Sequence, residues 1–398
     1  MKTYTITDYG YNGEGVCKDN GKVFFVPKTL KGEKVSFEII KENSKFGFCK
    51  IKSIISPANN RISPPCPYYD KCGGCNFQHI TYDNELDIKK EIYLRELSKA
   101  TNIKNIDIIK SDKDYGYRNK VRFKVKNNTL GFYEEKTNNF IKIDNCIICD
   151  EKINHAISKI KKFLASTKEN FSEIIIFSFQ NNVFVDFLTQ NKKTSKKQFE
   201  NFDLPHMINH NGEIDTEFMG LKFKFKGDAF RQINDDIAEK LYIKVLSTLE
   251  NKIVLNAYSG AGVLSGLIAK KAKHVYGIEL NQNAHLSAES LKKINNIANL
   301  TNICGYAEKE IDKIYDVEFV VVDPPRAGCD KQFLQTILNK DIDNFIYISC
   351  NPATLVRDLK ILQEKYEMFD LLLFDMFPQT ANVETFVWLK ANRLTKTN

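Results

Sequence analysis

The chain has 398 residues, of which 42% are apolar, enough to bury the cores of two or three domains. Its 58 Lys and Arg residues outnumber 50 Asp and Glu residues, and the net charge of +8 permits a polyanionic partner without requiring one. No apolar run approaches the ~20 residues of a membrane span, and the first residues lack a signal-peptide pattern. We therefore expect a cytoplasmic protein without a membrane partner.

Residues 1–58 predict a small β-barrel. Alternating runs at 22–26, 33–39 and 46–51 are interrupted by Gly and Pro, as in short barrel strands. Cations and aromatic rings are interspersed here, a mixture that suits single-stranded RNA, although a solvated barrel with an aromatic core explains it equally well. These residues are Lys28, Lys31, Lys34, Lys45 and Lys50, with Tyr11, Phe24, Phe46 and Phe48.

A cysteine loop follows this first unit. Cys66, Cys72 and Cys75 have the spacing C-x5-C-x2-C, and Cys146 and Cys149 are candidates for a fourth thiolate. In a cytosolic chain of this length such clustering indicates a metal or catalytic role rather than disulfides. From spacing alone, four thiolates suit a tetrahedral zinc ion as well as an iron–sulfur cluster.

The segment 59–219 predicts a β-rich central domain with the cysteine loop at its start. An amphipathic helix runs through Leu86, Tyr93 and Leu97, with apolar positions at helical spacing. Further along, strands at 173–179 and 183–187 flank an Asn-Asn pair, which is a hairpin signal.

From residue 220 to 398 strands alternate with helices, which predicts an α/β fold with a parallel sheet. A helix with apolar residues at i, i+4 spacing begins near Ile237. The expected strands lie at 252–256, 274–278, 318–322, 345–348 and 385–389.

A glycine turn after the first of these strands favours a nucleoside-containing methyl donor. Gly260 and Gly262 allow the backbone to approach a ligand closely at a helix N-terminus, beside Tyr258. Glu279 ends the next strand, where a carboxylate can accept both ribose hydroxyls. A dinucleotide fingerprint has a third glycine or alanine at position 265, where this chain has Ser265. The strand, glycine turn, helix, second strand and acid together favour S-adenosylmethionine over NAD. A tight turn with a surface Glu is the plainer alternative.

Two reactive side chains are expected at the carboxyl edge of the same sheet, and a third precedes its last strand. Asp323 and Cys350 each follow a strand, and Glu384 directly precedes the last one. A thiolate that adds to carbon 6 of uracil makes carbon 5 nucleophilic, and a base must then remove the carbon-5 hydrogen. We predict Cys350 as nucleophile, Glu384 as base and Asp323 as acceptor of the uracil imide hydrogen. Arg326 can favour the thiolate or hold a phosphate.

At these residues the chain resembles the RNA uridine-5 methyltransferase family, and the resemblance covers nearly its whole length. It rests on the F-x-Q-x-N segment 230–234, the S-C-N-P segment 349–352, the N-V-E segment 382–384, the C-G-G-C segment 72–75 and the G-E-G-V segment 13–16. The resemblance implies a Rossmann-like S-adenosylmethionine methyltransferase domain at 220–398, preceded by an OB-like TRAM barrel at 1–58 and a central domain at 59–219.

The resemblance also implies site residues and partners. Gln232 is expected to contact S-adenosylmethionine with Tyr258, Gly260, Glu279 and Asp323. A [4Fe-4S] cluster is implied at Cys66, Cys72, Cys75 and Cys146, with Cys149 the weaker candidate. The chain departs from the family at Asn256, where Asp is usual, and at Tyr306, where an acid is usual.

The expected substrate is a uridine of 23S ribosomal RNA, modified by a monomer; the runner-up is the T-loop uridine of transfer RNA. Two rival interpretations come from other classes. An amino-group methyltransferase with an acidic P-P loop needs neither Cys350 nor Glu384, and an RNA-binding protein on a relict fold needs no methyl donor.

Overall fold

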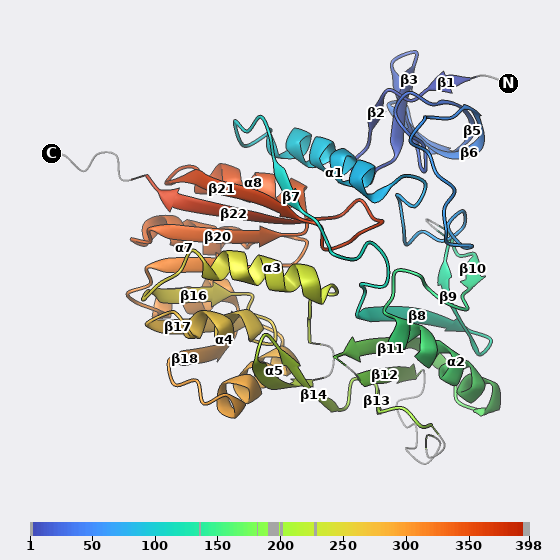
Figure 1. The fold of residues 1–398 in the computed structure, drawn as a ribbon. Helices are drawn as coiled ribbons and strands as arrows, with labels where there is room; N and C mark the ends of the chain where they lie inside the picture. Colours follow the sequence, from blue (N-terminus) through green and yellow to red (C-terminus); the bar gives the residue numbers. More distant parts are fainter. Residues whose placement is uncertain are drawn as a thin grey trace.

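The computed structural model describes residues 3–134, 137–180, 182–189, 199, 202–226 and 229–392. Its strands form an N-terminal sheet, a central sheet, a two-stranded hairpin and a large eight-stranded sheet. Figure 1 shows the large sheet on one side of the molecule, with the N-terminal and central sheets on the other side.

The N-terminal sheet has six strands in the order β1-β5-β6-β4-β3-β2. The three runs predicted as strands are β4, β5 and β6, and β4 pairs with β6 in parallel while its other neighbour is antiparallel. The bounds are β1 Tyr4–Thr5, β2 Asp8–Tyr9, β3 Gly15–Asp19, β4 Lys22–Val26, β5 Lys34–Glu42 and β6 Phe46–Ser56.

The central sheet has the order β10-β9-β8-β11-β12-β13, and helix α2 packs against it. The predicted hairpin is confirmed, because β11 and β12 pair antiparallel with Phe179 opposite Asn182. The bounds are β8 Lys120–Lys126, β9 Thr129–Tyr133, β10 Phe140–Lys142, α2 Glu151–Ser166, β11 Phe171–Phe179, β12 Asn182–Thr189 and β13 His206–Ile208, followed by the hairpin β14 Glu213–Phe218 and β15 Leu221–Lys226.

The large sheet has the order β18-β17-β16-β19-β20-β22-β21-β7, and β22 alone runs antiparallel to its neighbours. The five predicted strands are β16, β17, β19, β20 and β22, whereas β7, β18 and β21 were not predicted. The bounds are β7 Asp107–Ile109, β16 Ile253–Ala257, β17 His274–Glu279, β18 Leu300–Cys304, β19 Phe319–Val322, β20 Asn344–Ser349, β21 Tyr366–Phe374 and β22 Glu384–Ala391.

Helices cover both faces of the large sheet. Along β20 the fully buried residues alternate, so that Phe345 and Tyr347 face one cluster while Ile346 and Ile348 face the other. None of the described helices combines the length and apolar character needed to cross a membrane. The bounds are α1 Tyr82–Leu97, α3 Asp235–Leu246, α4 Val263–Ala269, α5 Gln282–Ile294, α6 Ala307–Glu310, the 3-10 helix η2 Ile311–Lys313, α7 Lys331–Asn339 and α8 Pro352–Leu362.

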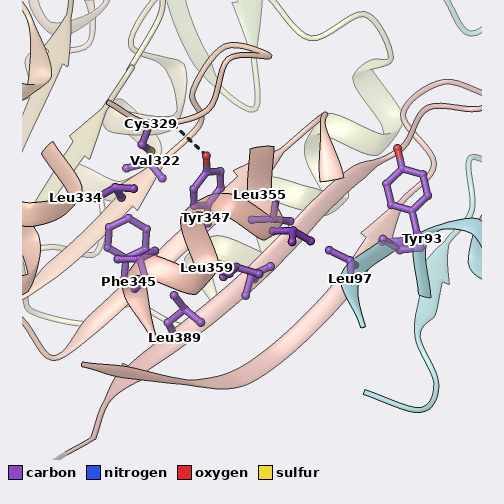
Figure 2. Packing of buried hydrophobic residues seen from close by; sticks show 14 of the residues in the cluster. Tyr93, Leu97, Val322, Cys329, Leu334, Phe345, Tyr347, Leu355, Leu359 and Leu389 are labelled. Carbon is purple, nitrogen blue, oxygen red and sulfur yellow. Dashed lines mark hydrogen bonds between the residues drawn. The ribbon is translucent and has the colours of Figure 1, made fainter. Parts of the chain in front are cut away.

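Two elements from the segment 59–219 are part of the large sheet and its core. Strand β7 pairs in parallel with β21, and α1 packs against α8. Figure 2 shows Tyr93 and Leu97 of α1 in the same apolar cluster as Leu355 and Leu359 of α8. The predicted domain boundaries stay predictions, but α1 shares a core with the residues that follow position 220.

This shared core gives a stability prediction. Leu97 is fully buried, so Leu97→Ala removes its apolar contacts and should lower the free energy of unfolding by about 2–5 kcal/mol. The chain has one tryptophan, Trp388 in β22, whose fluorescence reports on the large sheet during denaturant unfolding. The half-exposed Leu286 of α5 gives the matched control Leu286→Ala, which should change little. An unshifted Trp388 transition in Leu97→Ala would show that α1 unfolds separately.

Candidate active site

The direction of β22 brings the three predicted reactive residues to one edge of the sheet. Asp323 follows β19 and Cys350 follows β20, so both lie at the carboxyl ends of parallel strands. Because β22 runs the opposite way, its first residue, Glu384, lies at this same edge. Ser349 is opposite Thr385 in the β20–β22 pair, and Cys350 and Glu384 are therefore neighbours.

Side chains of the loop after β20 tie it to the loop after β19. Asn351 caps α8 by accepting a hydrogen bond from the Ala353 backbone N–H at 3.1 Å. Its Nδ2 donates to the Arg326 carbonyl oxygen at 2.9 Å, and the Thr354 hydroxyl donates to the same oxygen at 3.2 Å. The Cys350 loop and the Arg326 loop are thereby held side by side.

Burial raises the pKa of all three reactive groups, and repulsion from neighbouring groups adds to the shift at Glu384 and Cys350. Burial raises the pKa of Asp323 to about 7. Burial also raises the pKa of Glu384 well above its ordinary value, with Asp323 adding to the shift and Arg326 opposing it. For Cys350, burial, then Glu384 and Asp323, raise the pKa to about 11, and Arg326 again opposes. Two buried acids and a thiol in one site are an arrangement suited to proton transfer and nucleophilic addition.

Glu384 has a carboxyl oxygen that, among the residues described, is free to accept a hydrogen bond or a proton. Its side chain is 3% exposed, and its Oε2 has no hydrogen-bond partner within the described part of the chain. An unpartnered buried carboxyl oxygen is costly and is retained where chemistry uses it.

A cavity beside this edge is lined by the predicted donor-binding residues. Gln232, Tyr258, Gly260 and Asp323 line it, and the Gln232 Nε2 donates to the Asp323 Oδ2 at 3.2 Å. Asp323 therefore joins the cavity to Cys350 and Glu384. Glu279 is not among the lining residues; its Oε2 accepts from the Gly260 N–H at 2.8 Å.

The local backbone explains the residue types of this turn. Tyr258 and Gly260 have positive φ angles of 59° and 56°, a region that is strained for tyrosine and open to glycine. Gly262 is required for packing, because a Cβ there would lie 2.6 Å from the Ala288 Cβ of α5.

The cavity suits a ligand with both apolar and polar parts. Its lining includes the aromatic rings of Phe223, Phe225 and Phe230. Asn256 also lines it, and its buried Oδ1 has no partner among the residues described, although its Nδ2 donates to Ser265. These groups fit S-adenosylmethionine, which carries a nucleoside, a sulfonium centre and an amino acid.

All five candidate cysteines line a second cavity, of about 340 Å³. Burial raises the pKa of Cys66, Cys72 and Cys75, and the nearby Cys146 adds to each shift. Across the described ranges no group of three or more His, Cys, Asp or Glu side chains is placed to hold a metal ion. The thiols thus surround a space and do not converge on one point.

Two tyrosines near the site were not predicted as site residues. Tyr11, in the loop between β2 and β3, lies close enough to Arg326 and Cys350 to interact electrostatically with both. Tyr11 and Tyr93 of α1 lie close enough to influence each other's pKa. The sequence placed Tyr11 among RNA-stacking rings and Tyr93 on an apolar helix face, and no local pattern connects either with residue 350.

Comparison with known proteins also identifies the chain as an RNA methyltransferase. The family model described as tRNA (Uracil-5-)-methyltransferase matches residues 208–392. Two relatives described as uncharacterized RNA methyltransferases are similar over nearly their whole lengths. The Staphylococcus aureus protein is 32% identical, covering 97% of each chain, and the Listeria monocytogenes protein is 33% identical, covering 98% of this chain and 97% of its own.

A solved structure shares the fold. It is the Pyrococcus abyssi tRNA (uracil-54, C5)-methyltransferase in complex with S-adenosyl-L-homocysteine, with a TM-score of 0.82 and 24% identity over 97% of this chain and 99% of that one. The sheet order and these similarities define the class as an α/β RNA methyltransferase. Within that class, the chain belongs to the RNA uracil-5 methyltransferase family. The resemblance inferred from its motifs is confirmed.

The electrostatics of Cys350 can be tested by alkylation. Only the thiolate reacts with iodoacetamide, so with a pKa of about 11 the rate at Cys350 should rise about tenfold per pH unit between about pH 7 and 10. Arg326→Ala should slow it severalfold, because the cation that favours the thiolate is lost. Peptide mass spectrometry separates Cys350 from the other cysteines, and the exposed Cys304 is the internal control. Equal rates in both proteins would contradict the role of Arg326.

Proposed function

We propose that the protein methylates carbon 5 of a uridine in RNA, using S-adenosylmethionine and a transient bond to Cys350. The observation that carries this proposal is the meeting of Cys350, Asp323 and Glu384 at one sheet edge beside the Gln232 cavity. A thiol is unnecessary for methylating an amino group, but it is needed to activate a pyrimidine carbon.

The roles follow from the chemistry of each group. The Cys350 thiolate adds to carbon 6, which moves electron density to carbon 5 and the neighbouring oxygen. Asp323 accepts a hydrogen bond from the imide N–H and holds the ring beside the cavity. S-adenosylmethionine supplies an electrophilic methyl group. Glu384 then takes the carbon-5 hydrogen as a proton, and the carbon–sulfur bond breaks to return the thiolate.

The perturbed pKa of Glu384 supports its assignment as the base. A carboxylate with an ordinary pKa is a weak acceptor for a carbon-bound hydrogen. Burial beside Asp323 raises the proton affinity of Glu384, which increases the driving force for this transfer.

The substrate base must leave its RNA helix to reach this site. Cys350 follows β20 and Glu384 begins β22, and Glu384 is almost fully buried. A stacked uridine cannot approach such a group, so we infer that it is flipped out of the RNA. The N-terminal barrel, with its cations and aromatic rings, is our candidate for binding the flanking single strand.

We place 23S ribosomal RNA first as the substrate and the T-loop of transfer RNA second. The barrel and the cysteine loop support the first choice. The second is favoured by a specific similarity, because a transfer RNA enzyme shares this fold over 97% of the chain.

We further propose that Cys66, Cys72, Cys75 and Cys146 hold a [4Fe-4S] cluster. The family resemblance favours an iron–sulfur cluster over a zinc ion, and all four thiols line one cavity. Cys146 influences the pKa of all three loop cysteines, which favours it over Cys149. The cluster is structural or orients RNA, because methyl transfer involves no net electron flow.

The mechanism predicts two opposite outcomes for two variants. With S-adenosylmethionine and 5-fluorouridine-substituted 23S RNA, the wild type should form a denaturation-resistant adduct, since fluorine cannot leave as a cation. Cys350→Ala should form none and lose methylation, yet retain donor binding by equilibrium dialysis. With natural RNA, Glu384→Gln should add and methylate but stall, so crosslinked protein accumulates on denaturing gels.

The same experiment tests the substrate when transfer RNA is assayed in parallel. Adduct formation with transfer RNA and none with 23S RNA would replace the first choice by the second. Full methylation by Cys350→Ala would exclude the covalent mechanism, and normal turnover by Glu384→Gln would assign the base elsewhere.

The cluster predicts coloured protein containing about four iron atoms per chain when purified without chelator. Cys66→Ser and Cys146→Ser should lose iron, whereas Cys149→Ser should keep it. The exposed Cys304 gives the control Cys304→Ser, which should match the wild type. Colourless protein with stoichiometric zinc would contradict the cluster.

A further inference from the structure

The loop between β21 and β22, residues 375–383, leads directly into the proposed base Glu384. Residues from segments about 260 to 305 positions earlier hold this loop. For example, the Tyr117 hydroxyl donates to the Pro378 carbonyl oxygen at 2.9 Å. Because the loop sets the position of Glu384, its contacts bear on the reaction.

A buried ionic cluster anchors the start of this loop. The Lys89 ammonium of α1 donates to the Asp375 carboxylate at 2.5 Å and to the Glu85 carboxylate at 2.6 Å, and all three side chains are fully buried. Glu85 also accepts from the Gln379 backbone N–H at 2.7 Å. Helix α1 therefore fixes both the first residue and the middle of the loop.

The cysteine loop contacts the same point from the other side. Directly after Cys75, the Asn76 and Phe77 backbone N–H groups donate to the Gln379 carbonyl oxygen at 2.7 and 3.2 Å. The Asn76 Oδ1 accepts from the Ala381 backbone N–H at 3.2 Å. A residue adjacent to a candidate cluster ligand is thus bonded to the chain three positions before Glu384.

The conformation that these bonds enforce is strained. Gln379 has a φ of 69°, in the left-handed region that a glutamine rarely adopts, and it is 1% exposed. Strained residues persist where surrounding contacts over-determine them, and they gather at functional sites. Gln379 is held through its N–H by Glu85 and through its carbonyl by the cysteine loop.

The end of the loop is held by Tyr93. Its hydroxyl accepts from the Val383 backbone N–H at 3.0 Å, directly before Glu384. Figure 2 shows the Tyr93 ring in the core cluster with its hydroxyl directed away from Leu97 and Leu359. The apolar body of Tyr93 thus fixes the ring, and its hydroxyl fixes the backbone beside the base.

We propose that Asn76 and Tyr93 are positioning residues for Glu384, so that the cysteine loop and α1 together set the geometry of proton removal. This inference rests on the proposed function of Glu384. Cys350 lies on a separate loop, and the bonds from Asn351 and Thr354 to the Arg326 carbonyl oxygen that hold this loop involve neither Asn76 nor Tyr93. Proton removal and product release should therefore slow while addition of the thiolate continues.

The test measures adduct formation and adduct release separately in single-turnover assays with natural RNA and S-adenosylmethionine. In Asn76→Ala and Tyr93→Phe, release should slow about tenfold or more, because a displaced base reacts poorly, so methylated adduct accumulates. Asn76→Asp keeps the acceptor for Ala381 and should restore release.

Matched controls separate positioning from general destabilisation. The Asn344 Oδ1 accepts from the Trp388 Nε1 at 3.1 Å, at the opposite end of β20 and β22, and Asn344→Ala should release at the wild-type rate. Glu384→Gln is the reference for a stalled adduct.

The outcomes are distinguishable. If Glu384→Gln accumulates adduct while Asn76→Ala and Tyr93→Phe release normally, the positioning role is overturned and the proposed function stands. If both positioning variants lose adduct formation and release in equal proportion, their role is only structural and the inference is again overturned. If Glu384→Gln accumulates no adduct, Glu384 is not the base, and both the proposed function of Glu384 and the positioning role are overturned.

Discussion

The reversal of one strand determines the chemistry of this protein. Seven strands of the large sheet run in one direction, and their carboxyl ends offer positions such as Asp323 and Cys350 for reactive groups. A residue at the start of a parallel strand would lie at the opposite edge, about 25 Å away for a strand of eight residues. Because β22 is antiparallel, its first residue, Glu384, reaches Cys350. A thiol and two carboxyls therefore meet at one edge of the sheet.

Bringing these three groups together in a buried site makes their charged forms less stable, and this changes the pKa of each group. Burial disfavours the charged forms of Asp323, Glu384 and Cys350, and the two carboxyls further oppose the thiolate. Arg326 is the cation that opposes these effects at both Glu384 and Cys350. This balance keeps the Cys350 thiol mostly protonated and gives Glu384 a high proton affinity. Both properties are compatible with the covalent mechanism proposed above.

The sequence predicted the parts of the site that follow local rules. Asp323 and Cys350 could be placed because each follows a compact apolar strand, and the cysteine spacing predicted thiols around one space. Strand β21 was missed because polar residues interrupt its apolar pattern, and β7 was missed because three residues carry too little periodicity.

Contacts between distant segments lay beyond any local pattern. Asn76 reaches Ala381, and Tyr93 reaches Val383, across about 290 to 305 positions, and each bond involves a backbone N–H that exists at every non-proline residue. The sequence predicted an apolar face on helix α1, but it did not indicate that this face packs against α8. The same limit applies to Tyr11, which the chain brings from the N-terminal sheet to the neighbourhood of Cys350.

The buried ionic cluster is better explained by conformational precision than by stability. Burying Lys89 with Glu85 and Asp375 removes three charges from water, and burial raises the pKa of Glu85 to about 8 even though Lys89 favours its charge. Apolar residues of similar volume would often stabilise a core at least as well. Once the cluster is built, however, removing one partner costs about 3–5 kcal/mol. That exceeds the roughly 1–3 kcal/mol of backbone strain at a residue such as Gln379, so the strained loop persists and Glu384 beside it stays in place.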